Sequence, residues 1–149
     1  MGNDYDISNS VTEVTLCRFN KRYGKAFLGS GDNIIMRQHN AQGLLNYLCD
    51  RFRIPYCRVQ IIDKAQLHRT NANGRLKQKT YGRYYPAMMY IEIFNRTAMR
   101  NQTVSINVMY DTLLHEFMHH YDTAKMGIKS AHTKGFYMRI SDLRSKLGQ

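Results

Sequence analysis

Two histidines stand four residues apart in the pentapeptide His115-Glu116-Phe117-Met118-His119, with a glutamate directly after the first. In a helix, residues i and i+4 lie on one face, so both imidazoles could bind a single zinc ion. Glu116 would be rotated to the side of that face, where its carboxylate could accept a proton from a water on the metal. The pattern therefore predicts zinc-dependent hydrolysis with Glu116 as the general base. The alternative is a surface helix whose histidines and glutamate only face water.

The pentapeptide belongs to a predicted helix that includes residues 113–121. Asp111 has the residue type and the position of an N-cap, so we expect the helix to begin after it. His120 would point about 100° away from His119, and we do not expect it to bind the metal. The apolar residues form a stripe beside the two histidines, which indicates a helix packed on a core: Leu114, Phe117, Met118 and Tyr121.

A catalytic zinc ion usually has three protein ligands and one open position, so a third ligand is required. Asp122 lies on the same face as the first histidine but roughly 10 Å along the helix axis, too far for its short side chain. We expect Asp122 either to hold the ring of His119 from behind or simply to face water. His132 is the better candidate, because Gly127 indicates a helix end and the apolar spacing of residues 136–147 predicts a second helix. A histidine near a helix start without a metal role is the alternative for His132.

The segment HEFMHHYD is followed, after a short connection, by HTKGFYMRISDLRSKL. With these motifs, residues 110–147 resemble the SprT-like zinc metallopeptidases, which include bacterial SprT proteins and the DNA-dependent protease Spartan. In that family the HExxH helix is followed by a third zinc-binding histidine in an HGxxF-like motif that opens another helix. The chain departs from this motif because Gly135 follows Thr133 and Lys134 instead of the histidine itself.

The resemblance implies a Zn²⁺ site made by His115, His119 and His132. It implies that Glu116 is the catalytic base and that Phe136 is the packing aromatic of the second motif. The implied fold is α+β: a minimal zincin-like domain that has a small β-sheet, an HExxH active-site helix and a C-terminal helix.

The upstream pattern gives the same order of elements. Hydrophobic spacing predicts a helix at residues 41–52 and strands at residues 57–62 and 88–94. By the same resemblance, the strand at residues 90–94 would lie beside the cleft and pair with an extended substrate through backbone hydrogen bonds. We therefore assign residues 37–149 to a SprT-like zincin metallopeptidase domain.

Residues 1–36 form an N-terminal segment with no well-defined pattern. Its first ten residues are polar and are expected to be mobile. Residues 11–19 alternate in part and could form a strand, and residues 29–32 have the composition of a turn.

The length of 149 residues suits one compact domain. No apolar run is long enough to predict a membrane span, and the first residues lack the pattern of a signal peptide. Cys17, Cys49 and Cys57 are an odd, scattered set that fits neither a disulfide framework nor a zinc ribbon. We therefore expect reduced thiols and a cytoplasmic protein.

The formal net charge is +11, and residues 51–83 contain nine basic residues against one acid, Asp63. Part of this stretch, residues 70–80, looks like a loop. Basic residues beside aromatic side chains are typical of a surface that binds single-stranded or distorted nucleic acid. A solvated basic face is the alternative. The candidate nucleic-acid-binding residues are Arg75, Lys77, Lys79, Arg83, Tyr84 and Tyr85.

Together these features predict a zinc metalloendopeptidase that hydrolyses peptide bonds in protein or peptide substrates, near or on DNA if the basic stretch binds it. One alternative is a basic nucleic-acid-binding module with a structural metal. Glu116 argues against it, because a structural site has no use for an acid beside an open position. The other is a zinc peptidase that acts on a repressor or on a phage or mobile-element protein. A tyrosine could stabilise the oxyanion, and eleven are available.

Overall fold

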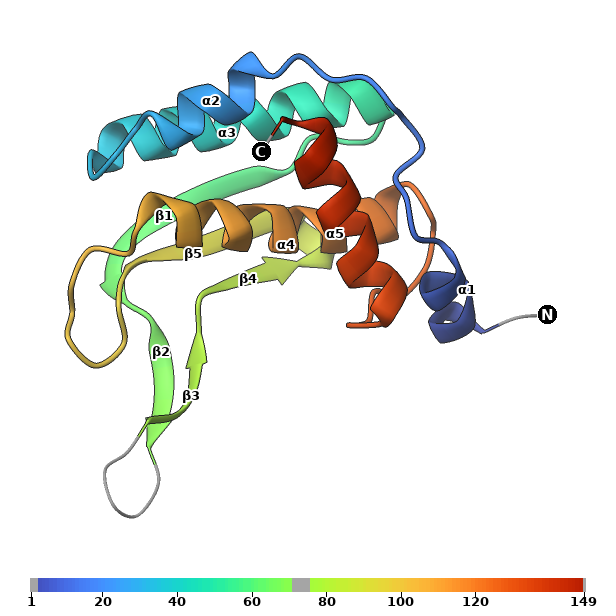
Figure 1. Cartoon of the computed structure of the whole chain (residues 1–149). Helices are drawn as coiled ribbons and strands as arrows, with labels where there is room; N and C mark the ends of the chain where they lie inside the picture. The colour runs from blue at the N-terminus through green and yellow to red at the C-terminus, as the bar shows by residue number, and fades with distance from the viewer. Residues whose placement is uncertain (1–2, 71–75, 149) are drawn as a thin grey trace.

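The computed structural model describes residues 3–70 and 76–148. Within them, five α-helices accompany a three-stranded mixed sheet, and two further strands form a separate pair, an α+β architecture (Figure 1). The elements follow in the order α1 (Asp4–Ser10), α2 (Arg22–Leu28), α3 (Ile34–Phe52), β1 (Arg58–Ala65), β2 (Leu67–Thr70), β3 (Leu76–Thr80), β4 (Gly82–Tyr85), the 3-10 helix η1 (Pro86–Met88), β5 (Tyr90–Arg96), α4 (Ile106–Ala124) and α5 (Lys134–Lys146).

The main sheet has the strand order β1-β5-β4. β5 is parallel to β1, with Val59 opposite Ile91, and antiparallel to β4, with Gly82 opposite Ile93. The expectation that residues 90–94 form the strand beside the cleft is therefore wrong. β5 is hydrogen-bonded on both sides, and β4 is the edge strand next to α4.

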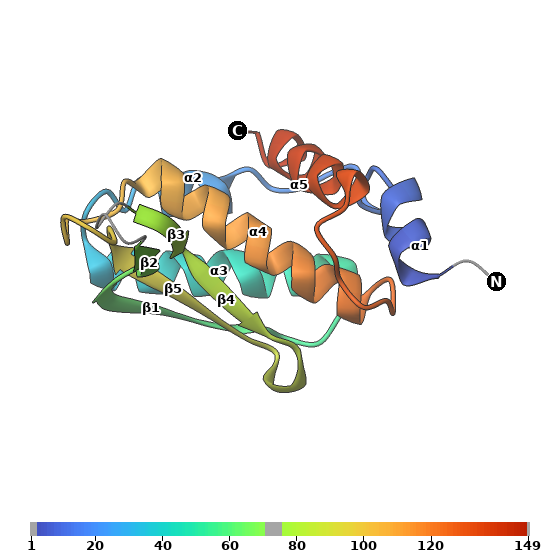
Figure 2. The same ribbon diagram turned by 90° about the horizontal axis from the view of Figure 1, so that it is seen from below.

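Helices cover one face of this sheet, with α3 against β1 and α4 against β4 and β5 (Figure 2). Apolar side chains at alternate positions bury this face, whereas the residues between them are more exposed, as expected for a sheet covered on one side. The inward residues are Val59 and Ile61 of β1 and Ile91 and Ile93 of β5.

The helix α4 carries the HExxH sequence and begins earlier than expected. Its N-cap is Ser105, whose side chain accepts a hydrogen bond from the backbone N–H of Val108. The expected N-cap, Asp111, is wrong because it lies inside the helix and forms an ion pair with Arg144 of α5. The helix therefore has additional turns before residue 113, which anchor it in the core through Met109 and Tyr110.

The expectation that the first ten residues are mobile is wrong for residues 4–10, which form α1, and residues 1 and 2 lie outside the described residues. Asn3 caps α1 by accepting a hydrogen bond from the backbone N–H of Asp6, and the helix packs on α5. The expected boundary between residues 36 and 37 falls inside α3.

The expected strand at residues 11–19 is also wrong. Backbone donors of this segment bond to side chains of the helices instead of to a neighbouring strand: Val14 N–H donates to Asp142 at 2.9 Å and Thr15 N–H to the Tyr121 hydroxyl at 3.1 Å. The turn at residues 29–32 is confirmed.

The expectation of a loop at residues 70–80 is wrong for residues 76–80, which form β3, whereas residues 71–75 lie outside the described residues. β2 and β3 pair antiparallel, with Leu67 opposite Thr80, and extend away from the main sheet in Figure 1. Lys77 and Lys79 are part of β3, and Arg75 lies outside the described residues.

Candidate metal centre

Three histidines from two segments meet above the middle of α4. His115 and His119 are one turn apart on α4, and His132 lies in the connection before α5. The Nε2 atom of His132 is 3.2 Å from that of His115 and 3.1 Å from that of His119. Nitrogen ligands about 2.0–2.1 Å from a tetrahedral zinc ion are roughly 3.3 Å apart, so both distances to His132 suit such an ion. The ligand atoms of all three histidines lie within 4.8 Å of one another.

The protonation states of the α4 histidines suit metal binding. Burial, together with the nearby His132, lowers the pKa of His115 to about 4. Burial, followed by the neighbouring histidines, lowers the pKa of His119 to about 3. Both rings are therefore neutral near pH 7, and a neutral imidazole nitrogen is a metal ligand.

Phe136, on the first turn of α5, packs against all three rings. Its centroid is 4.6 Å from that of His119, 5.1 Å from that of His115 and 5.4 Å from that of His132. The Phe136 side chain is fully buried, so it is a fixed part of the core against which the three rings pack.

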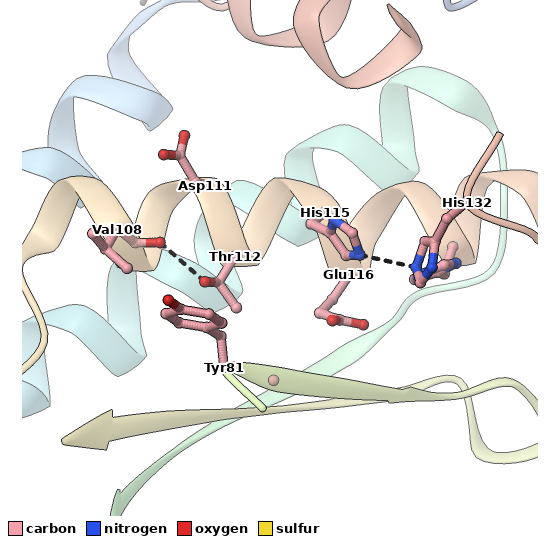
Figure 3. Close-up of a pocket in the computed structure, with 9 residues that line it drawn as sticks. Tyr81, Val108, Asp111, Thr112, His115, Glu116 and His132 are labelled. Atoms are coloured by element: carbon pink, nitrogen blue, oxygen red, sulfur yellow. Dashed lines mark hydrogen bonds between the residues drawn. The ribbon is translucent and has the colours of Figure 1, made fainter. Parts of the chain in front are cut away.

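Glu116 extends from α4 toward β4, beside the histidines (Figure 3). Its side chain is buried, and that burial raises the pKa of the carboxyl to about 7. Gly82 of β4 makes the close approach possible, because a Cβ there would lie 3.0 Å from Cγ2 of Thr112 and 3.4 Å from Cγ of Glu116.

Two cavities lie along β4, and both include Glu116 and His119 in their lining. One, of about 560 Å³, contains the three histidines and Glu116 and extends along α4 past Thr112. The other, of about 520 Å³, shares Glu116 and His119 and extends over Tyr84 and Tyr85 to Ser130. The three histidines and the Glu116 carboxylate therefore lie in the middle of an open groove that runs along the edge strand β4.

The outer edge of β4 offers backbone hydrogen bonds to this groove. The carbonyl of Tyr81 accepts a bond from the N–H of Phe94, so the pairs alternate along the ladder and the N–H and C=O groups of Gly82 and Tyr84 point away from β5. Within the described residues, no strand pairs with that side of β4.

Asp122 is linked to the ring of His119 through Ser130. It is fully buried, so the alternative of a water-facing aspartate is wrong. Its Oδ2 accepts a hydrogen bond from the Ser130 hydroxyl at 2.7 Å. The Ser130 Oγ atom is in turn 2.8 Å from Nδ1 of His119. Arg139 forms an ion pair with Asp122 at 2.9 Å. The sequence pattern did not indicate Ser130 or Arg139, because neither residue belongs to a metal-site motif.

His120 points away from the trio, as expected. Its Nε2 is 2.8 Å from the Pro55 carbonyl and its Nδ1 is 2.8 Å from the Tyr84 hydroxyl. Because Nε2 must donate to the carbonyl, Nδ1 accepts and the Tyr84 hydroxyl donates. This pair ties the edge strand to α4.

The candidate nucleic-acid residues lie on different strands. The Tyr84 ring is partly buried against the core, and the Tyr85 ring stacks on Tyr90 with centroids 5.8 Å apart. Arg83, between them, is exposed. Nucleic-acid binding stays a prediction from the sequence.

Comparisons with known protein families, with curated proteins and with solved structures found no match to this chain. Among the described helices, none is both long and apolar enough to cross a membrane.

Proposed function

We propose that the chain is a zinc-dependent metallopeptidase of the SprT-like type, which hydrolyses peptide bonds in protein or peptide substrates. The observation that carries the proposal is the convergence of three histidines, with Nε2 of His132 3.1–3.2 Å from the Nε2 atoms of the other two, beside a buried glutamate in an open groove. In the described chain the cluster contains three potential ligands, His115, His119 and His132. Three protein ligands and a free position are typical of catalytic zinc, whereas structural sites usually have four.

An extended peptide would bind along β4. Its backbone would pair with the outward N–H and C=O groups of Gly82 and Tyr84, which recognise any sequence because they are main-chain groups. This geometry would place a peptide bond beside Glu116 and the three histidines, since all of them line the same cavity as Gly82.

Zinc held by the three histidines would polarise the scissile carbonyl and lower the pKa of a bound water. Glu116 would accept the proton of the attacking water and pass it to the departing amine. A carboxyl with a pKa near 7 suits both transfers at neutral pH, because it releases and accepts a proton at similar cost.

The structure narrows the choice of a tyrosine that stabilises the oxyanion. The Tyr84 hydroxyl donates to His120, and the Tyr81 ring extends along α4 toward Val108, away from His115 (Figure 3). The Tyr137 ring of α5 lies beside the trio, with its centroid 6.0 Å from that of His115 and 6.1 Å from that of His132. We assign this role to Tyr137 within the proposal.

The test compares the wild type with Glu116→Gln. The amide cannot accept the water's proton, so the variant should keep its zinc and its thermal midpoint but lose cleavage of an unstructured protein substrate by about 100-fold or more. Proteolysis by the variant at the wild-type rate would overturn the proposal, and so would a wild-type protein that binds no zinc. The basic binding module with a structural metal predicts zinc binding without any difference between the two proteins in proteolysis.

A further inference from the structure

A continuous series of polar contacts, buried from Asp122 onward, leads from the candidate metal centre to the N-terminal helix. Ser130 Oγ lies between Nδ1 of His119, at 2.8 Å, and Oδ2 of Asp122, at 2.7 Å. Both carboxylate oxygens of Asp122 accept bonds from one nitrogen of Arg139, at 2.9 and 3.0 Å. The side chains of Asp122 and Arg139 are 0% exposed, so water does not compete for these bonds.

The hydrogen bonds in this series have only one consistent direction. The Arg139 guanidinium can only donate, so the Asp122 carboxylate accepts from it. The single hydrogen of the Ser130 hydroxyl points to Asp122, which leaves the Ser130 oxygen to accept from Nδ1–H of His119. The other ring nitrogen of His119, Nε2, then carries no hydrogen and faces the trio with its lone pair. Ser130 therefore selects the tautomer that binds a metal.

Arg139 also holds α1. Its second terminal nitrogen donates to the backbone carbonyls of Ser8 and Val11, both at 2.6 Å. The Ser8 hydroxyl is 3.1 Å from Arg139 and 2.8 Å from the hydroxyl of Thr133, the residue after His132. The helices α1 and α5, which these contacts connect, lie side by side in both views (Figures 1 and 2).

α1 contacts the connection that carries His132 on both sides of this histidine. Before it, the backbone N–H of Lys129 donates to the Asp4 carboxylate at 2.9 Å. After it, the backbone N–H of Gly135 donates to the side chain of Asn9. A Cβ at Gly135 would lie 2.1 Å from the Ser8 carbonyl oxygen, so only glycine allows α1 to approach this closely. Gly135 is the glycine whose position departs from the HGxxF-like motif.

We propose that α1, Ser130 and the buried residues Asp122 and Arg139 are positioning elements of the metal centre, and that docking of α1 and binding of metal stabilise each other. The inference rests on the metal-binding part of the proposed function and does not depend on peptide hydrolysis. Because linkage is reciprocal, any contact of α1 that raises the affinity for metal is itself strengthened when the metal binds.

The first test measures zinc affinity by competition with a chromogenic chelator for the wild type, Ser130→Ala and Ser130→Thr. Loss of a group that orients a ligand typically weakens metal affinity by about 10–100-fold. We expect that loss in Ser130→Ala and at least partial rescue in Ser130→Thr, which restores the hydroxyl. Thr123→Ala is the matched control, because its hydroxyl bonds to the backbone carbonyl of His119 and not to the ring. Equal affinity of Ser130→Ala and wild type, or an equal loss in Thr123→Ala, would overturn the inference.

The second test follows α1 in the unmodified protein by hydrogen exchange, with zinc and after chelation. Amides of residues 7–10 should exchange faster without zinc, whereas amides in the middle of α3, which packs on α2 and β1, should be unchanged. Identical exchange of α1 in the two states would refute the coupling. A wild type that binds zinc and responds in both tests, yet cleaves no protein, would refute the proposed hydrolysis alone.

Discussion

Gly82 and Glu116 show at the residue scale how closely β4 and α4 approach each other. The absence of a side chain at Gly82 leaves room for Glu116, and a Cβ would also lie only 2.9 Å from the backbone oxygen of Glu92. Neither Glu92 nor Thr112 can move freely, because one belongs to the central strand and the other to α4. The position of the carboxylate therefore depends on a glycine that belongs to no catalytic motif.

Gly82→Ala should lower kcat/KM for peptide cleavage by about 10–100-fold, because an error of about 1 Å in placing a catalytic group has an effect of this size. Zinc content should stay at the wild-type level, since the atoms nearest to the added methyl group belong to Glu92, Thr112 and Glu116 and not to a histidine. Gly43→Ala is the matched control: it lies in α3 with open space around it, and alanine there should stabilise the helix by about 0.5–1 kcal/mol. Wild-type cleavage by Gly82→Ala would show that this contact does not position Glu116.

Replacing any one histidine of the trio by alanine should sharply reduce the zinc content from about one ion per chain, because two protein ligands hold the ion far more weakly than three. His132→Ala is the most informative variant, since His132 comes from outside the HExxH helix. His39→Ala, an exposed histidine on α3, should keep full occupancy. Full occupancy in His132→Ala, measured by metal analysis after dialysis, would contradict the ligand assignment.

The spacing of His115, Glu116 and His119 could be predicted from the sequence because it is local, and a helix places i and i+4 together without help from the fold. His132 could be proposed because it precedes an amphipathic helix. Ser130 could not be predicted, since its role depends on the way that the connection folds back over α4 to lie 2.8 Å from His119.

Among the strands, the sequence pattern predicted the buried central strand β5 more clearly than the edge strand β4. The pattern predicts β5 clearly because its residues on the helix-covered face are apolar and because a central strand buries most of its residues. β4 contains four residues, including a glycine and an arginine, so its pattern is weak although it borders the groove. α1 has no apolar stripe, and its helix depends on Asn3 and on polar contacts to α5 that no local pattern encodes.

The junction of α3 and β1 buries two of the three cysteines. Burial raises the pKa of Cys49 to about 11 and that of Cys57 to about 12, whereas Cys17 is exposed. A disulfide reagent at pH 8 should therefore modify one thiol of the native protein rapidly and all three after denaturation, because the thiolate is the reactive form. Rapid reaction of Cys17→Ser would contradict the burial of the other two.

The same thiols should make stability depend on alkaline pH. Between about pH 9 and pH 11 the native state keeps protons that the unfolded chain releases, so the free energy of unfolding should fall as the pH rises through this window. Urea unfolding at several pH values measures the slope. A Cys49→Ala variant should show a smaller slope than the wild type.

For the whole molecule, the charge of +11 is the main feature that the metal centre does not explain. The basic residues between 51 and 83 fall on several elements, including the end of α3, β1, β3 and the edge strand β4. The expected loop at residues 70–80 therefore carries only some of them, and two of these, Lys77 and Lys79, belong to the strand β3. The composition could show the excess but not its arrangement, because the folding of the strands decides which face each residue occupies.

If this region binds nucleic acid, affinity should fall steeply with salt, because each neutralised phosphate releases a counterion and contributes roughly 0.7–0.9 to the logarithmic slope. Replacing Arg75, Lys77 and Lys79 together by glutamine should reduce that slope by about 2–3 and leave the zinc content unchanged. Tyr85→Ala should weaken binding to single strands more than to duplexes if its ring stacks on bases. Tyr84 is a poorer test, because its hydroxyl bonds to His120 and its loss would disturb α4. Fluorescence anisotropy with a labelled oligonucleotide measures these effects, and a slope that the triple substitution leaves unchanged would reduce the basic stretch to a solvated surface.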